Sequence, residues 1–82
     1  MPATRNIFLV DDDEAVCHAL STFLEATGYS VRVFNSAETF LEKAGDTAGS
    51  IMLLDQRMTG MSGLGLQEEL ARRGTDLPVI FI

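Results

Sequence analysis

The sequence predicts an α/β protein whose core is a doubly wound parallel sheet. Three short apolar segments, at residues 7–10, 51–54 and 79–82, alternate along the chain with segments whose apolar residues recur at helical spacing. The runs at 7–10 and 51–54 contain no polar residue, which is typical of strands that helices cover on both faces. Strands and helices in alternation form βαβ units with right-handed crossovers. The 82 residues suffice for one small domain and are too few for two.

The first strand and the first helix are expected between residues 7 and 28. The strand ends at a run of four acids, in which Asp13 is suited to cap a helix and Glu14 to occupy its first turn. We expect a helix of about thirteen residues, because Gly28 then supplies the left-handed conformation that ends helices. The apolar stripe of this helix comprises residues at helical spacing, namely Val16, Leu20, Phe23, Leu24 and Thr27.

The remaining elements follow in the same way. Residues 29–34 alternate apolar and polar side chains, which indicates a half-exposed edge strand. Ser36 is suited to cap a second helix that ends near Gly45. A loop over residues 55–62 leads from the third strand to a third helix, which Gly74 closes before the fourth strand. With the second strand at the edge and the first and third strands most apolar, the predicted strand order is 2-1-3-4.

Composition excludes several classes of function. The chain has 12 acidic and 6 basic residues, for a formal net charge of −6, so this segment lacks the basic surface needed to bind nucleic acid directly. A single cysteine, Cys17, excludes an internal disulfide framework. Apolar runs are too short for a signal peptide or a membrane span. We therefore expect a cytoplasmic protein with no membrane association.

Carboxylates follow two strands that are expected to be neighbours. Asp11 and Asp12 come after the first strand, and Asp55 comes after the third. Ligands of open parallel sheets bind at the carboxyl ends of the strands, where the strand order reverses, so these three acids should converge in one crevice. Three adjacent negative charges favour a hard cation such as Mg²⁺. Beside such a cation Asp55, alone on its strand end, is the candidate nucleophile toward a phosphoryl group.

These residues resemble a known family. Val10-Asp11-Asp12, Leu54-Asp55 and the following Met58 and Gly63 resemble the response-regulator receiver domain of bacterial two-component systems. The segment 57–63, Arg-Met-Thr-Gly-Met-Ser-Gly, looks most like the class with a C-terminal LuxR-type helix-turn-helix.

The resemblance implies a flavodoxin-like receiver fold and a regulatory module that is not an enzyme. It implies that Asp55 accepts a phosphoryl group from a sensor histidine kinase and thereby controls a transcriptional output domain. It further implies that Asp12 binds Mg²⁺ directly, that Asp11 binds it through water, and that Arg57 contributes its backbone carbonyl.

The sequence departs from the family pattern in three respects. Thr59 stands where the family commonly has proline, which removes a fixed φ from the loop, and Gln56 is polar where the family often has an apolar residue. The family's switch Ser/Thr and its lysine lie beyond Ile82. We therefore expect residues 1–82 to be a partial receiver domain, without its last strand and helices, and with any DNA-binding domain outside the chain. The bare edge of the fourth strand is expected to favour self-association.

Two alternatives stay open. Asp11-Asp12-Asp13 after a buried strand also resembles the signature of haloacid-dehalogenase-like phosphohydrolases, in which Asp11 would form the aspartyl-phosphate and Asp13 would act as acid and base. That signature normally continues with a small residue and then Thr or Val, whereas Glu14-Ala15 follows here. The other alternative is an interaction module of the same fold that works without phosphorylation.

Overall fold

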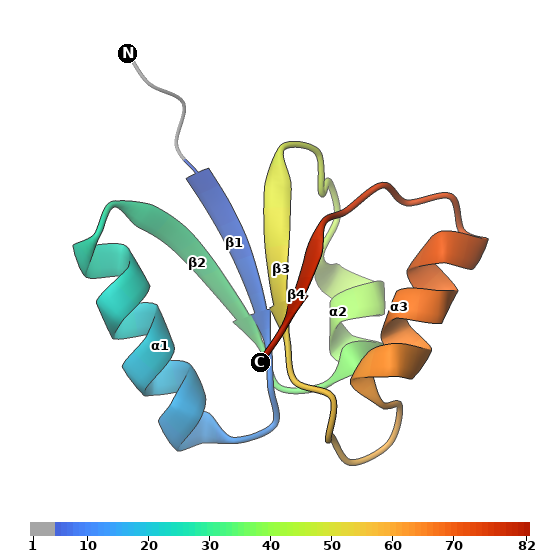
Figure 1. Cartoon of the computed structure of the whole chain (residues 1–82), viewed down its shortest axis with the longest axis horizontal. Coiled ribbons are helices and arrows are strands. Elements are labelled where there is room, and N and C mark those ends of the chain that lie inside the picture. Colours follow the sequence, from blue (N-terminus) through green and yellow to red (C-terminus); the bar gives the residue numbers. More distant parts are fainter. Residues whose placement is uncertain (1–4) are drawn as a thin grey trace.

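The computed structural model describes residues 5–82 of the chain. Strands and helices alternate throughout this range (Figure 1). In chain order the elements are β1 (Arg5–Val10), α1 (Glu14–Ala26), β2 (Tyr29–Phe34), α2 (Ala37–Lys43), β3 (Ser50–Leu54), α3 (Gly63–Arg72) and β4 (Val79–Phe81).

The four strands form one parallel sheet in the order β2-β1-β3-β4. Val10, the last residue of β1, is in register with Phe34 of β2 and with Leu54 of β3. The carboxyl ends of these three strands therefore lie level with one another. The predicted α/β class and the strand order 2-1-3-4 are confirmed.

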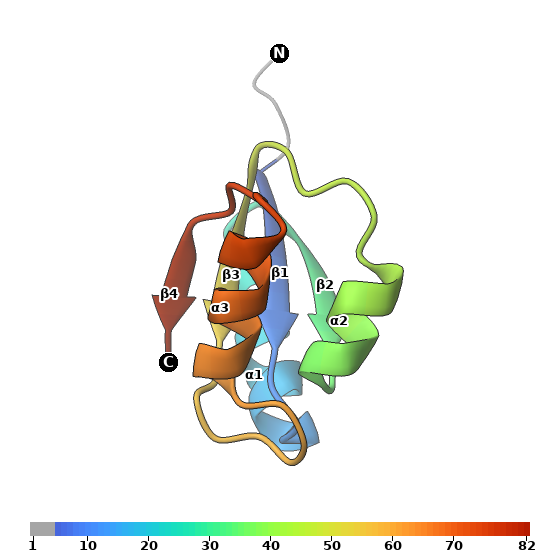
Figure 2. The same ribbon diagram turned by 90° about the vertical axis from the view of Figure 1, so that its right-hand side faces the viewer.

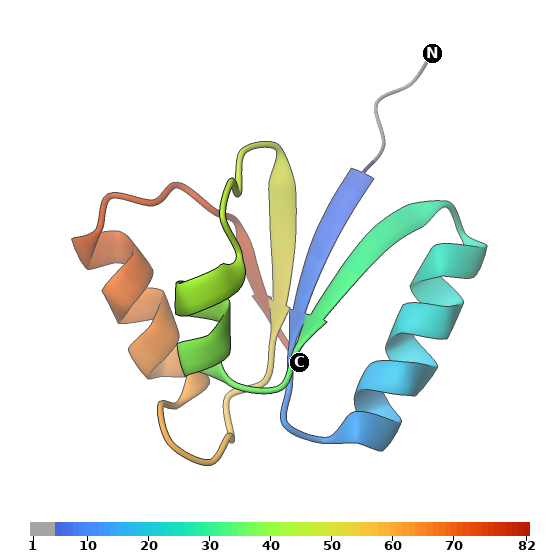
Figure 3. The ribbon, with the colours of Figure 1, turned by 180° about the vertical axis from the view of Figure 1, so that it is seen from behind.

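The helices lie on both faces of the sheet, with α1 on one face and α2 and α3 on the other (Figures 1 and 3). Figure 2 shows α2 and α3 side by side in front of the strands. The main core lies between the sheet and these two helices, where Met52, Leu54 and Leu66 are fully buried. Phe8 and Phe34 each pack edge to face against Phe40, with ring centroids 5.3 Å apart. The rings of Phe8 and Phe34 are tilted relative to each other, with centroids 6.1 Å apart.

The opposite face is only partly covered. Helix α1 packs over β2 and β1, and among residues 5–82 no helix lies over β3 and β4 on this side. Ile51 of β3 and Ile80 of β4 remain 39% and 53% exposed. Phe23, which belongs to the apolar stripe of α1, is 64% exposed. Its helical spacing is correct, but it has no layer to pack against.

The ends of the elements match the residues that predict them. Asp13 is the N-cap of α1, and its carboxylate accepts hydrogen bonds from the amides of Ala15 and Val16. Gly28 has a φ of 101° and redirects the chain from α1 into β2. Ser36 caps α2 by accepting from the amide of Thr39. Within the described part of the chain, no helix combines the length and apolar character needed to cross a membrane.

Candidate functional site

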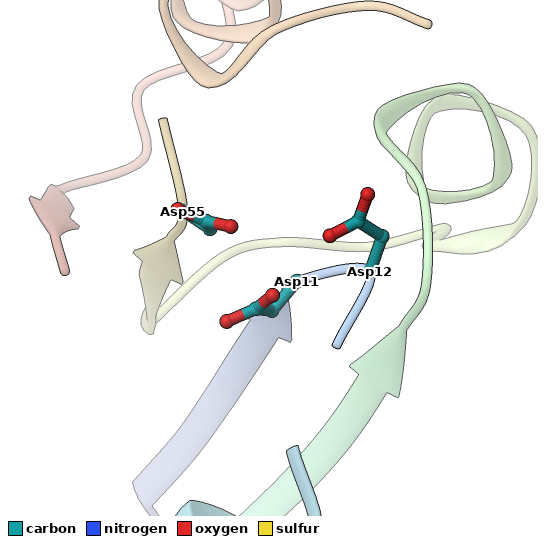
Figure 4. Close-up of side chains that lie close together, drawn as sticks. All are labelled: Asp11, Asp12 and Asp55. Atoms are coloured by element: carbon teal, nitrogen blue, oxygen red, sulfur yellow. The ribbon is translucent and has the colours of Figure 1, made fainter. Parts of the chain in front are cut away.

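The sheet brings three carboxylates together at its carboxyl edge. Asp11 and Asp12 directly follow β1, and Asp55 directly follows β3. The ends of the strands stay aligned past their last residues, because the Asp55 amide donates to the Val10 carbonyl at 3.0 Å. One oxygen atom from each of Asp11, Asp12 and Asp55 lies within 4.8 Å of the others (Figure 4). The convergence predicted from the sequence is therefore observed.

The three acids differ in burial. Asp11 is buried, Asp55 is half-buried and Asp12 is exposed. Burial raises the pKa of Asp11, and the negative charges of Asp55 and Asp12 raise it further, while a hydrogen bond from the Asp13 amide opposes the shift. The site thus places one buried carboxylate beside two more accessible ones, with little distance between their negative charges.

This donor set fits a hard divalent cation. Mg²⁺ prefers carboxylate, carbonyl and water oxygens, and it is usually held by one or two carboxylates rather than by a complete protein cage. Asp11, Asp12 and Asp55 supply only such oxygens, from one buried and two accessible positions. A cation at this point would also offset the repulsion that raises the pKa of Asp11.

Hydrogen bonds to the Asp55 carboxylate and to the Gln56 carbonyl hold the two ends of the loop after Asp55. The Arg57 amide donates to Asp55 Oδ1 at 3.2 Å, and the Gly63 amide donates to the Gln56 carbonyl at 3.2 Å. Gly63 is buried, and a Cβ at this position would overlap the Asp55 carbonyl oxygen. Ser62 then caps α3 by accepting from the Gly65 amide. Glycine at position 63 therefore allows α3 to start directly beside the candidate nucleophile.

Two further carboxylates hold the middle of the loop. Asp12 Oδ2 accepts a hydrogen bond from the Thr59 amide at 3.0 Å, and Glu38 Oε2 accepts one from the Met61 amide at 3.0 Å. Gly60 between them has a φ of 82°, and a Cβ there would lie 2.8 Å from Glu38 Oε2. Glu38 lies in the first turn of α2, and nothing in the local sequence indicates that α2 lies beside the loop after β3.

Other residues near the acids have structural contacts. Asp13 Oδ1 accepts both capping bonds of α1, which engages this carboxylate in the helix start. Cys17 is buried, and its Sγ donates to the Asp11 carbonyl at 3.2 Å. Burial raises the pKa of the Cys17 thiol, and the nearby acids add to the effect, so the thiol is poorly suited to nucleophilic chemistry. For Arg57 the structure shows the amide contact described above, and metal binding by its carbonyl stays a prediction.

Comparison with known proteins agrees with this geometry. The family model described as response regulator receiver domain matches residues 7–82. The response regulator protein TmoT of Ectopseudomonas mendocina is 46% identical over 76 residues, which cover 93% of this chain and 34% of TmoT. The transcriptional regulatory protein FixJ of Azorhizobium caulinodans is 38% identical over 80 residues, which cover 98% of this chain and 38% of FixJ. The chain thus spans about a third of the length of these curated relatives.

A solved structure shows the same fold. The response regulator StyR superposes with a TM-score of 0.89 at 39% sequence identity, covering 96% of this chain and 40% of StyR. The sheet order, the three acids at its carboxyl edge and the match over residues 7–82 agree with one another. The chain belongs to the response regulator receiver domain family.

Proposed function

We propose that this chain accepts a phosphoryl group on Asp55 from a sensor histidine kinase, with Mg²⁺ held by Asp11, Asp12, Asp55 and the Arg57 carbonyl. The observation that carries the proposal is the convergence of three carboxylate oxygens within 4.8 Å at the ends of β1 and β3. A bound Mg²⁺ would neutralise the charge of the acids and of the incoming phosphoryl oxygens.

The transfer itself requires one accessible carboxylate oxygen. An Asp55 oxygen attacks phosphorus, and a P–O bond forms as the P–N bond to the kinase histidine breaks. The electron pair of the broken bond leaves with the histidine nitrogen. Asp55 is half-buried and can be reached from solvent, whereas Asp11 is buried. These exposures support Asp55 over Asp11 as the acceptor.

The phosphohydrolase alternative is less well supported. It requires the buried Asp11 as the nucleophile and Asp13 for proton transfer. Asp13 Oδ1 accepts from the Ala15 and Val16 amides as the cap of α1, and Asp13 does not belong to the cluster of Asp11, Asp12 and Asp55. The receiver function requires all three acids of the cluster and is compatible with Asp13 as the cap of α1. An interaction module that needs no phosphorylation has no specific observation in its favour.

The proposal extends to the arrangement of the whole protein. We propose that residues 1–82 form the first part of a receiver domain whose switch Ser/Thr and lysine lie beyond Ile82. The relatives TmoT and FixJ are about three times as long as their match to this chain, which supports an output domain outside it. We also propose that this output domain is a LuxR-type helix-turn-helix, that the protein controls transcription, and that it is located in the cytoplasm.

Modification by a small phosphodonor tests the proposed acceptor. The chain is incubated with acetyl phosphate and Mg²⁺, and the intact mass is measured for the wild type, Asp55→Asn and Asp13→Asn. We expect a single phosphoryl addition in the wild type and in Asp13→Asn, and none in Asp55→Asn or when the metal is chelated. Modification that persists in Asp55→Asn would instead support the phosphohydrolase, in which Asp11 carries the phosphoryl group.

A further inference from the structure

A backbone amide of the loop contacts the acidic site directly. The Thr59 N–H donates to Asp12 Oδ2 at 3.0 Å, across 47 positions of the sequence. It joins the loop after β3 to the end of β1. Two other amides of this loop also donate to carboxylates, Arg57 to Asp55 and Met61 to Glu38 of α2. The Thr59 contact is thus the one of these three that reaches the β1 acids.

This contact depends on the residue type at position 59. Proline has no backbone N–H and could not donate to Asp12, whereas every other residue could. The bond therefore follows from having threonine where the resemblance leads one to expect proline. It comes from the main chain, so the threonine side chain is not needed for it.

The bond constrains a carboxylate that would otherwise be free. Asp12 is exposed, and hydration alone would leave its side chain several orientations. Figure 4 shows one Asp12 oxygen directed toward Asp55. Because Asp12 Oδ2 accepts the Thr59 amide, the carboxylate is restricted in its orientation relative to the loop. The same bond holds the segment that carries Arg57 close to the end of β1.

We propose that Thr59 is a positioning residue, whose backbone N–H orients Asp12 and holds the loop after Asp55 in place for binding of Mg²⁺. This inference rests on the proposed function, because it takes Asp12 and the Arg57 carbonyl as metal ligands. When the ligands that follow the two strands are already oriented, less conformational entropy is lost when the metal binds. Loss of the N–H should therefore weaken Mg²⁺ binding without removing any ligand.

Three forms of position 59 separate the amide from the side chain. Thr59→Ala keeps the N–H, Thr59→Pro removes it and adds a ring, and an ester in place of the amide, introduced by semisynthesis, removes the N–H alone. Mg²⁺ is titrated into each form, after circular dichroism has verified its fold. We expect Thr59→Ala to bind within twofold of the wild type. The proline and ester forms should bind about tenfold more weakly, since one hydrogen bond to a charged group is lost.

A second readout reports the bond itself. The Thr59 amide proton should resonate downfield in the wild type and move upfield in Asp12→Ala, whereas Asp13→Ala should leave it in place. An ester form that binds Mg²⁺ as tightly as the wild type would overturn the inference, even if Thr59→Pro binds weakly, because the ring would then be the cause. A wild type that shows no binding at millimolar Mg²⁺ would instead refute the proposed metal site, and the inference with it.

Discussion

Gly63 packs so closely against Asp55 that a Cβ on Gly63 would overlap the Asp55 carbonyl oxygen and lie 2.9 Å from the Gln56 Cα. Both obstructing atoms belong to the backbone and cannot move aside as a flexible side chain would. The start of α3 and the position of the candidate phosphoacceptor are therefore mechanically coupled.

Gly63→Ala should displace the Asp55 backbone and destabilise the fold by ~2 kcal/mol, because overpacking of buried positions typically costs that much. Urea denaturation measures the stability, and acetyl phosphate labelling measures the effect on Asp55. Gly65→Ala is the matched control, since its Cβ would meet only the side chains of Met61 and Ser62. If Gly63→Ala were as stable as Gly65→Ala and labelled as fast as the wild type, the coupling would be absent.

Asp11→Asn should stabilise the metal-free chain at neutral pH. Burial and the neighbouring acids raise the pKa of Asp11 in the folded state. The contribution of Asp11 to the stability of the fold is therefore greatest below its pKa in the unfolded chain. It is lost as the pH rises through the pKa of Asp11 in the folded chain. At pH 7 the ionised Asp11 opposes folding, so its neutralisation should raise the melting temperature by about 4–8 °C if it contributes ~1 kcal/mol.

The stability difference between Asp11→Asn and the wild type should narrow as the pH falls, because Asp11 then becomes neutral in the folded wild type. Thermal melts from pH 7 to pH 4 in the presence of a chelator measure this difference. Added Mg²⁺ should raise the stability of the wild type more than that of Asp11→Asn. If the stability difference between Asp11→Asn and the wild type stayed constant over this pH range, ionisation of Asp11 would not oppose folding.

Asp13→Ala should cost ~1 kcal/mol of stability, because it removes the two hydrogen bonds that cap α1. It should leave Mg²⁺-dependent labelling of Asp55 unchanged once the protein is folded. Glu14→Ala is the control, since Glu14 lies in the first turn of α1 and does not act as its cap. Loss of labelling in a folded Asp13→Ala would show that this carboxylate takes part in the chemistry.

The chain should self-associate through the partly covered face of its sheet. Phe23, Ile51 and Ile80 are 64%, 39% and 53% exposed, and β4 presents an unpaired edge among the described strands. Size-exclusion chromatography with light scattering should show a mass that increases with concentration. Ile80→Lys should reduce this association, whereas Leu64→Lys, on the exposed surface of α3, should not. A concentration-independent monomer would contradict the prediction.

Local signals in the sequence predict much of the fold. The caps at Asp13 and Ser36 and the stop at Gly28 depend on neighbouring backbone groups, so residue type and spacing suffice to locate them. The convergence of Asp11 and Asp55 follows from strand order, because level strand ends place their next residues side by side.

Features that depend on the packing of distant elements could not be predicted in this way. The exposure of Phe23 and Ile51 reflects which layers cover them, and helical spacing or apolar character carries no information about that. The bonds from Glu38 to Met61 and from Asp12 to Thr59 join residues 23 and 47 positions apart. They require the actual path of the loop after β3.

Identification of the phosphorylated residue determines whether Asp55 is the phosphoacceptor. The chain is treated with acetyl phosphate and Mg²⁺ and then reduced with borohydride, which converts an aspartyl phosphate to homoserine, and the digested peptides are sequenced by tandem mass spectrometry. We expect homoserine at position 55 alone, and none when the metal is chelated. Homoserine at position 11, or at no position despite a folded chain with bound Mg²⁺, would contradict it.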